Sequence, residues 1–495
     1  MKRLLLLIVL ICNVSISQTF TGTVFLDKNN NGVFDAEENP MPNILVSNGK
    51  DVVTTGSKGE YKINAISGNL VFIIKPSGYI SKLNKENTVQ FYFNPKDVTS
   101  KEYNFPLYKN DESPKSKIAF LGDVQVDVID DVHHVGKLVT EELAINKPDF
   151  IMPLGDLSFD NLNIFNPLSK VLGLVGVPVF YVIGNHDLNF DKVKFRDRDS
   201  SFEANFGPSY YAFEYGKNLF LVLNNINPLP NGKYNAVIDN DQMSFIKSII
   251  SLNKTKYEAI NLAMHIPFDE VLNKDSIIDI LKPFKDVFIA SGHTHTQYHN
   301  YYSRGETQQP IHEIVCGAVC GSWWQGAHDI RGIPFGMMYD GTPKGYWFMF
   351  AEGSSRSFNY KVSGAPDTKQ MNIWVPEVNE WDTGLNTLNE PYIYANVFAA
   401  DSNTKVEISF NNKNWHSMQY HYDVDPQLKR FYKIQELGRY NSLNISKSPK
   451  PVTKTKHLWR IKIPDSLNPG AYLINIKAKN TSQNFYVIGN RVLFK

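Results

Sequence analysis

Residues 117–125 read KIAFLGDVQ, an apolar run that stops at Gly122 and then presents Asp123 and Gln125. An aspartate after a strand is, taken alone, an ordinary turn residue. Four later apolar runs nevertheless carry a side chain that can bind a metal ion at or near their ends. These runs are DFIMPLGD (149–156), PVFYVIGNHD (178–187), YEAINLAMHIPF (257–268) and DVFIASGHTH (286–295).

From residue 118 to about residue 362, such runs alternate with helical stretches, for example 131–145 and 240–252, which indicates an α/β domain. Ligands of an α/β sheet gather at the carboxyl ends of its strands. A lone Asp is more often a helix cap, and a lone His a satisfied core residue. Five such ends in one domain instead predict that these side chains converge on a single metal-binding cleft.

The segments on either side of this domain have a different pattern. Residues 18–108 contain short alternating runs separated by Gly, Asn and Pro, which is typical of a small β-sandwich. A charged linker, KNDESPKSK (109–117), leads into the α/β domain, and short strands return after a linker near GAPDTKQ. We therefore expect three domains, at residues 18–108, 115–362 and 370–495.

The overall charge gives no support for a nucleic-acid or membrane-surface partner, because 51 basic and 50 acidic side chains leave a formal charge of +1. Residues 1–17 (MKRLLLLIVLICNVSIS) combine a basic end, an apolar stretch and a small-residue cleavage site. The apolar stretch is far shorter than the roughly 20 residues of a membrane-spanning helix. We therefore expect a signal peptide and an exported protein, which would be periplasmic, cell-surface or secreted.

Only two cysteines, Cys316 and Cys320, remain after the signal peptide. Two cysteines make no disulfide framework, so packed cores must stabilise the domains. A bridge between them requires the segment to turn back on itself, and two buried thiols are the simpler interpretation.

The first β-rich region contains DKNNNGVFDAEE (27–38), which has the spacing of a calcium-binding loop. Strand-like runs flank it, whereas helices flank the loop of an EF-hand. Two interpretations stay open, a structural calcium site and a solvated Asn/Gly turn. The residues at positions 1, 3, 5, 6, 9 and 12 of the loop are Asp27, Asn29, Asn31, Gly32, Asp35 and Glu38.

The series of strand ends resembles the motifs of the calcineurin-like metallophosphoesterases. Those motifs run Asp-x-His, Gly-Asp, Gly-Asn-His-Asp/Glu, His and Gly-His-x-His, and this chain has their counterparts in order over residues 118–296. The flanking β-modules, with GSWW (321–324) and DGTPKGYW (340–347), resemble the exported three-domain members of Bacteroidetes-type bacteria. The resemblance implies an α/β core of four αββα layers flanked by two small all-β sandwich domains.

The resemblance further implies two divalent cations that share Asp156. A carboxylate between two cations offsets their repulsion, and the pair lowers the pKa of a bridging water so that hydroxide exists at neutral pH. His186 corresponds to the residue that contacts the phosphoryl group or protonates the leaving group, and Asp187 is expected to orient it. One metal would be held by Asp123, Gln125, Asp156 and His295, and the other by Asp156, Asn185, His265 and His293.

Gln125 departs from the family pattern, which has His at this position. A carboxamide oxygen is a neutral and harder ligand than imidazole, which favours Mn²⁺ or Fe²⁺ over Zn²⁺, although Zn²⁺ is not ruled out by ligand type. The alternative is that Gln125 only forms a hydrogen bond and that the site holds one metal.

We therefore expect a hydrolase that cleaves small-molecule phosphate esters, with sugar- or nucleotide-linked substrates among the candidates. Family members with Asp-x-Gln give a slight preference for phosphodiester or diphosphate substrates. A phosphomonoesterase with the same site is the first alternative. A catalytically dead surface-binding or adhesive protein is the second, and the complete set of ligands argues against it.

Several residues near these motifs have weaker assignments. Trp323 and Trp324 could form an aromatic wall for a sugar or base, or could pack between domains, and packing is slightly favoured. His133 and His134 are expected at the surface or behind the ligands. Asp160 could orient a metal ligand or cap the following helix, and the cap is favoured. The remaining candidates for a substrate pocket are His328, Asp329, Arg331 and Asp340.

Overall fold

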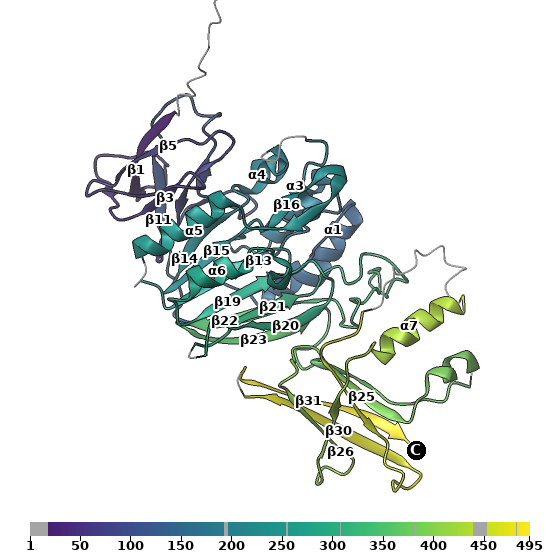
Figure 1. The fold of residues 1–495 in the computed structure, drawn as a ribbon. Helices are drawn as coiled ribbons and strands as arrows, with labels where there is room; N and C mark the ends of the chain where they lie inside the picture. The colour runs from purple at the N-terminus through teal and green to yellow at the C-terminus, as the bar shows by residue number, and fades with distance from the viewer. Residues whose placement is uncertain are drawn as a thin grey trace, which may run out of the picture.

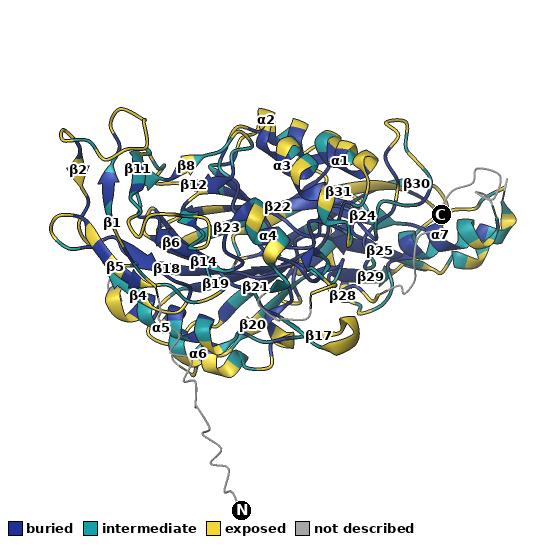
Figure 2. Ribbon diagram, turned by 90° about the horizontal axis from the view of Figure 1, so that it is seen from above, coloured by how far each residue is buried: buried dark blue, intermediate teal, exposed yellow. Residues whose placement is uncertain are grey.

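The computed structural model describes residues 18–192, 197–253, 256–306, 308–380, 382–438, 453–481 and 483–495 (Figure 1). The expected signal peptide at residues 1–17 lies outside the described residues. Within these ranges, every helix is too short or too polar to cross a lipid bilayer. Figures 1 and 2 both show the α/β core between a β-rich N-terminal region and a β-rich C-terminal region.

Two β-sheets pack face to face in the core. Aromatic rings fill the space between them, with Phe120 and Phe288 at a centroid distance of 6.1 Å, and Phe150 and Phe220 at 5.4 Å. The first sheet has the strand order β13 (Phe150–Pro153), β12 (Ser116–Leu121), β22 (Gly345–Glu352) and β23 (Ser355–Val362). The second has the order β14 (Tyr211–Tyr215), β15 (Asn218–Val222), β18 (Ala259–Ala263), β19 (Val287–Ser291), β21 (Ile311–Cys316) and β20 (Gln297–Tyr302).

Helices cover both outer faces, which confirms the four-layer αββα core. In Figure 2, α1, α2 and α3 lie along one side of the paired sheets, and α5 and α6 lie along the other. The expected helix near 131–145 is a continuous helical run in which a π-helical turn at 136–140 joins α1 to α2. The helices are α1 (Ile129–Val135), α2 (Glu141–Ile145), α3 (Phe165–Gly173), α4 (Ser200–Phe206), α5 (Asn240–Asn253) and α6 (Lys274–Leu281).

Each strand that precedes a candidate ligand pairs in parallel with another such strand, although β12 is also antiparallel to β22. β12 pairs with β13, and β18 pairs with both β15 and β19, all in parallel. These strands are buried along almost their whole length, with only Lys117 of β12 partly exposed, which explains why each is a nearly continuous apolar run in the sequence. Parallel pairing brings their carboxyl ends to the same edge of each sheet.

The N-terminal region forms two small sheets that pack against the core. Phe72 contacts Phe245 of α5 at a ring-centroid distance of 5.6 Å, and the buried Lys75 ammonium lies 2.6 Å from Glu112. One sheet contains β2 (Asn39–Pro40), β1 (Thr19–Leu26), β11 (Phe105–Lys109), β7 (Tyr79–Ile80) and β5 (Glu60–Asn64). The other contains β10 (Tyr92–Phe93), β6 (Val71–Ile74), β3 (Leu45–Ser47) and β4 (Val52–Thr54), and a separate hairpin pairs β8 (Lys82–Leu83) with β9 (Val89–Gln90).

The C-terminal region is a pair of four-stranded sheets with a hydrophobic core of its own. It also contains a helix, α7 (Pro426–Glu436), which an all-β pattern does not predict; the Asp425 side chain caps it by accepting a hydrogen bond from the Leu428 N–H at 3.0 Å. One sheet has the order β24 (Met371–Trp374), β25 (Tyr392–Val397), β29 (Leu458–Lys462) and β28 (Gln419–Tyr420). The other has the order β27 (His416–Ser417), β26 (Lys405–Ser409), β30 (Ala471–Asn480) and β31 (Phe485–Phe494).

A buried polar chain joins the core to the C-terminal region. Asp340 lies 3.3 Å from the Nε2 of His457, whose Nδ1 lies 2.6 Å from Asn396. Asp340 also accepts a hydrogen bond from the Gln297 N–H at 2.7 Å. The expectation that Asp340 lines a substrate pocket is therefore wrong, because its carboxylate is buried among these interdomain partners.

Candidate metal centre

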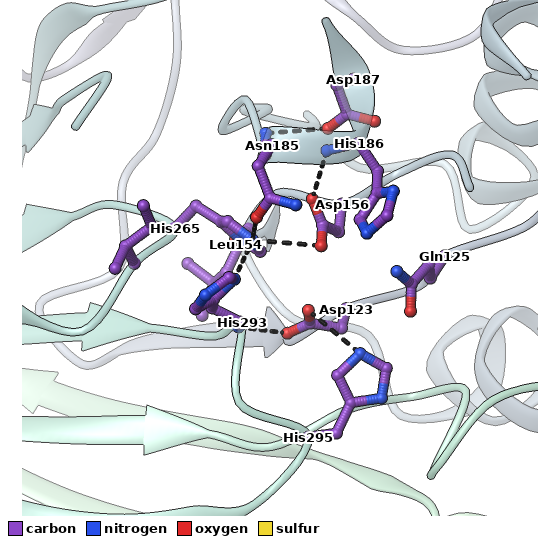
Figure 3. Close-up of polar contacts among 12 residues, drawn as sticks. Asp123, Gln125, Leu154, Asp156, Asn185, His186, Asp187, His265, His293 and His295 are labelled. Carbon is purple, nitrogen blue, oxygen red and sulfur yellow. Dashed lines mark hydrogen bonds and ion pairs between the residues drawn. The ribbon is translucent and has the colours of Figure 1, made fainter. Parts of the chain in front are cut away.

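The loops that follow the core strands bring all seven expected ligands into one group (Figure 3). Asp123 and Gln125 follow β12, and Asp156 follows β13. Asn185 begins a short 3₁₀ turn after an extended segment that continues the first sheet through bridges from Val179 to Ile151 and from Val182 to Leu154. His265 follows β18, and His293 and His295 follow β19.

His265 is at the centre of the first group of ligands. Its Nε2 lies 3.2 Å from Oδ2 of Asp156, 3.0 Å from Oδ1 of Asn185 and 3.2 Å from Nδ1 of His293. Its Nδ1 lies 2.9 Å from the Leu154 carbonyl, and a proton on Nδ1 would be donated there, leaving Nε2 free to bind a metal. Asp156, His265 and His293 each offer a ligand atom within 4.8 Å of the others, which fits one cation.

Asp123 is at the centre of the second group. Its Oδ2 accepts a hydrogen bond from the His293 N–H at 2.6 Å, and its Oδ1 lies 3.5 Å from Nε2 of His295. His295 is held through Nδ1, which lies 2.7 Å from the Gly321 carbonyl. Among the described residues, Asp123 Oδ1 has no hydrogen-bond partner although it is buried. A buried carboxylate oxygen in this state is costly, and a cation would satisfy it.

Gln125 is buried beside this second group. Its backbone N–H donates to the Asp156 carbonyl at 2.7 Å, and its carboxamide oxygen lies 3.8 Å from the Cys320 thiol. In the view of Figure 3, Gln125 and His265 lie on opposite sides of Asp156. This placement is compatible with Gln125 as a ligand of a cation other than the one at His265. Cys316 and Cys320 are both free and buried.

Five of the seven expected ligands have a left-handed backbone conformation. Residues other than glycine rarely adopt positive φ, and such conformations cluster at functional sites because the surrounding structure must impose them. Here they turn the chain sharply after each strand, which aims the side chains at the common space. The φ angles are 26° at Asp123, 44° at Gln125, 45° at Asp156, 75° at His293 and 50° at His295.

Gly184 explains why the third motif begins with glycine. A Cβ atom at this position would lie 1.8 Å from the backbone nitrogen of Asp156. Any larger residue would therefore separate the Asn185 turn from the loop that carries Asp156.

The site buries ionisable groups that depend on one another. Burial favours the neutral form of Asp156, but His265 and His186 outweigh it and lower the pKa of its carboxyl group. Burial lowers the pKa of His265, whereas Asp156 raises it, and the net result is a pKa of about 9. Burial lowers the pKa of His293 to about 3 and that of His295 to about 4, so both imidazoles are neutral and able to bind a metal at pH 7.

His186 is paired with an aspartate other than the expected one. Its Nδ1 lies 2.7 Å from Oδ1 of Asp160, and its ring stacks on Phe159 at 4.9 Å. The Asp187 carboxylate instead accepts hydrogen bonds from the N–H groups of Ser158 at 2.8 Å and Gly184 at 2.8 Å. The expectation that Asp187 orients His186 is therefore wrong, because the Asp187 carboxylate instead bridges the loops that contain Ser158 and Gly184.

Asp160 is the residue that sequence reasoning misassigned. It was expected to cap the next helix, but Asn161 does so by accepting a hydrogen bond from the Asn163 N–H. The only sequence signal for its role was its position four residues after Asp156. The same position is equally compatible with a helix cap. Asp160 has a φ of 67°, and this turn directs its carboxylate toward His186.

Replacing Asp160 by Asn should lower kcat about 10- to 100-fold, because a carboxamide holds the His186 imidazole in its orientation less firmly than a carboxylate does. The metal content should stay unchanged, since Asp160 contacts His186, which is not one of the seven expected metal ligands. Steady-state kinetics with metal analysis of the same sample tests this, and a variant as active as the wild type would exclude a role for Asp160.

The two tryptophans have different surroundings. Trp324 donates its indole N–H to the Val124 carbonyl at 3.0 Å and packs 5.4 Å from His134, so it has a packing role. Trp323 is partly exposed and contacts Phe159 at a ring-centroid distance of 4.2 Å. Phe159 in turn stacks on His186, so Trp323 lies at the His186 side of the site.

The other weak candidates do not join the ligands. His133 is exposed, and His134 packs against Trp324 and His328. Arg331 forms an ion pair with Asp329 at 2.7 Å.

Three family models match consecutive parts of the chain. They are described as the N terminal of calcineurin-like phosphoesterase (residues 28–110), calcineurin-like phosphoesterase (116–297) and the C terminal of calcineurin-like phosphoesterase (313–486). A crystal structure of a dimetal phosphatase from Danio rerio is similar over 52% of this chain and 100% of that chain, with 13% identity and a TM-score of 0.34. No curated protein matches the chain.

Proposed function

Because the chain belongs to the calcineurin-like phosphoesterase family, we propose that it is an exported, metal-dependent enzyme that hydrolyses a phosphodiester or diphosphate bond. The observation that carries the proposal is the convergence on His265, whose Nε2 lies within 3.2 Å of Asp156, Asn185 and His293. These donors come from four separate loops, and no hydrogen-bonding role within the fold requires all of them at one point.

The residues of the site can hold two divalent cations. When bound, such a pair supplies a hydroxide at neutral pH and neutralises the phosphate oxygens. Oxygen donors suit Mn²⁺ or Fe²⁺, and the site has four of them, from Asp123, Gln125, Asp156 and Asn185. The three imidazoles are also compatible with Zn²⁺. One cation would be held by Asp123, Gln125, Asp156 and His295, and the other by Asp156, Asn185, His265 and His293.

His186 is the proposed acid for the leaving group. The Nδ1 of its imidazole faces Asp160, and the stack on Phe159 fixes the plane of the ring. Its Nε2 is therefore the nitrogen available to hold a proton for the departing oxygen. Asp160 holds the imidazole in this orientation through its contact with Nδ1.

Phe159 and Trp323 support a substrate with a large leaving group. Their rings form an aromatic surface next to His186, the side from which the leaving group departs. Such a surface suits a sugar or a nucleobase. A diester or diphosphate carries that group beyond the scissile bond. A phosphomonoesterase with the same site is the alternative, and the experiment below distinguishes it from a phosphodiesterase.

The function is tested with bis-para-nitrophenyl phosphate and para-nitrophenyl phosphate, with added Mn²⁺. We expect hydrolysis of the diester at the higher kcat/KM, two metal equivalents per chain, and loss of activity in His186→Ala with both metals retained. A preference for the monoester would replace the diesterase proposal with the alternative. Two bound metals without hydrolysis of either compound would favour the binding protein.

Export is proposed from residues 1–17 alone. Expression of the full chain in a Gram-negative host, followed by mass spectrometry of the extracytoplasmic fraction, should give a protein that begins near Gln18. Retention of Met1 in the cytoplasmic fraction would contradict export.

A further inference from the structure

The loop of residues 27–38 connects β1 to β2 in the N-terminal region, at the end of the molecule where Figure 2 shows β2 beside β1. β1 and β2 are antiparallel, and Leu26 pairs directly with Asn39. This pairing holds the two ends of the loop together. Asp27 and Glu38, the first and last residues of the loop, are therefore neighbours at its base, and they are only 3% and 7% exposed.

The Asp27 carboxylate has one satisfied oxygen and one unsatisfied oxygen. Its Oδ2 accepts hydrogen bonds from the Gly32 N–H at 2.7 Å and from the Tyr108 hydroxyl at 2.9 Å. Its Oδ1 is buried and has no hydrogen-bond partner among the residues that the structure describes. Because Gly32 lies in the middle of the loop, the bond to its N–H turns this carboxylate toward the loop interior. A buried, unpaired carboxylate oxygen is costly unless a cation satisfies it.

Four other polar side chains of the loop form hydrogen bonds with one another or with its backbone. Asp35 Oδ2 accepts hydrogen bonds from the carboxamides of Asn29 and Asn31, both at 2.8 Å. The two oxygens of Glu38 accept from the backbone N–H groups of Lys28 at 2.9 Å and of Asp35 at 3.1 Å. The carboxamide oxygens of Asn29 and Asn31 accept hydrogen bonds from the backbone N–H groups of Asn31 at 3.1 Å and Val33 at 2.7 Å. A rotation that presents either oxygen to a cation would exchange one of these bonds for a metal contact.

No cationic side chain neutralises this group. Among the described residues, no Lys, Arg or His forms an ion pair with Asp27, Asp35 or Glu38. The one lysine of the loop, Lys28, directs its ammonium to the Glu37 carbonyl at 2.9 Å and to the Asn39 side chain at 3.3 Å. Three of the four carboxylates of the loop, those of Asp27, Asp35 and Glu38, thus have no cationic partner among the described residues.

We propose that the loop of residues 27–38 is a calcium site separate from the phosphoesterase centre. All of its donors are oxygens, and a carboxylate at position 12 can bind through both oxygens, which favours Ca²⁺ over Mg²⁺ and over transition metals. Two neutral asparagines replace further carboxylates, so we expect weak binding, with a dissociation constant on the order of 10⁻⁴ to 10⁻³ M. The ligands would be Asp27 Oδ1, the side-chain oxygens of Asn29, Asn31 and Asp35, the Val33 carbonyl, and both oxygens of Glu38.

Calcium binding would stabilise the N-terminal region by fixing the connection between β1 and β2. Tyr108 belongs to β11, which pairs in parallel with β1, and its hydroxyl already contacts Asp27. The cation would therefore be linked to three strands of one sheet through Asp27, Glu38 and Tyr108. A ligand that binds only the folded state raises the unfolding midpoint.

The test is a titration of the signal-free chain, with its phosphoesterase centre saturated with Mn²⁺, by CaCl₂ up to about 10 mM, well above the expected dissociation constant. Isothermal titration calorimetry should give one Ca²⁺ per chain, and Ca²⁺ should raise the thermal unfolding midpoint. Asp27→Asn and Glu38→Gln should weaken binding at least about 10-fold and abolish the thermal shift, because each removes a charged ligand.

Glu37→Gln is the matched control. It removes the same charge from the same loop, but Glu37 is exposed and stands at position 11, which supplies no ligand. We expect this variant to bind Ca²⁺ as the wild type does, and Asp156→Asn, altered only in the phosphoesterase centre, to do so too. Absence of Ca²⁺ binding by the wild type, equal binding by Asp27→Asn, or loss of binding in Glu37→Gln or Asp156→Asn would each overturn the proposal.

Discussion

Replacement of Asp156 by Asn should lower kcat/KM by at least about 10³-fold, which corresponds to a loss of about 4 kcal/mol of transition-state stabilisation. Asp156 is the residue that both expected cations share, and Asn retains its shape while removing its charge. The repulsion between the two cations would then be poorly offset. We therefore expect elemental analysis to show a fall from two metal equivalents to one or none.

Asp160→Asn is the comparison for this variant, because it changes a carboxylate four residues away and leaves the ligands in place. Circular dichroism should show both variants folded, since among the described residues the Asp156 side chain accepts one backbone hydrogen bond, from the His186 N–H at 2.9 Å. Two firmly bound metals and near-normal activity in Asp156→Asn would contradict the arrangement proposed for the centre.

Replacement of Asp340 by Ala should lower the free energy of unfolding by about 3–5 kcal/mol. The carboxylate is buried, and its loss leaves the N–H groups of Gln297 and Thr342 without their acceptor and His457 without its partner. Urea denaturation measures the effect. Asp279→Ala, which breaks an exposed ion pair with Lys282, should change stability by less than about 1 kcal/mol.

The same Asp340 substitution should also weaken the metal centre. Gln297 follows His295 by two residues, and the neighbouring Tyr339 N–H donates to the His295 carbonyl at 3.0 Å. A loosened 295–297 segment would hold the His295 imidazole less firmly against Asp123. We expect a higher metal concentration for half-maximal activity, and an unchanged value would limit Asp340 to a structural role.

The convergence of these side chains could be predicted from the sequence because most of them follow a buried strand. Because the strands pair in parallel, the residues that follow them, including Asp123, Asp156 and His265, lie at the same edge of the paired sheets. The partner of His186 was not predictable in the same way. Asp160 and Asp187 both lie near it in sequence, and the choice depends on a left-handed turn at Asp160 that no residue type announces.

The interdomain contacts were also beyond the sequence pattern. Asp340 follows a Gly- and Trp-containing stretch that has the composition of a pocket loop, and only the position of His457, more than a hundred residues later, makes it an interior residue. Helix α7 was missed although Leu428, Phe431 and Tyr432 have helical spacing, and one of their packing partners, Met337, lies in the core domain. Long-range packing of this kind leaves no local signature.

The strand order of the first core sheet, β13-β12-β22-β23, has a consequence for biosynthesis. β12 emerges from the ribosome more than two hundred residues before β22. In the folded protein, β22 pairs with the edge of β12 that β13 leaves free. Until residues 345–362 have been made, that apolar edge is open to other chains. Nascent chains should therefore need a holding chaperone, and truncation after residue 297 should yield aggregates in place of a smaller enzyme.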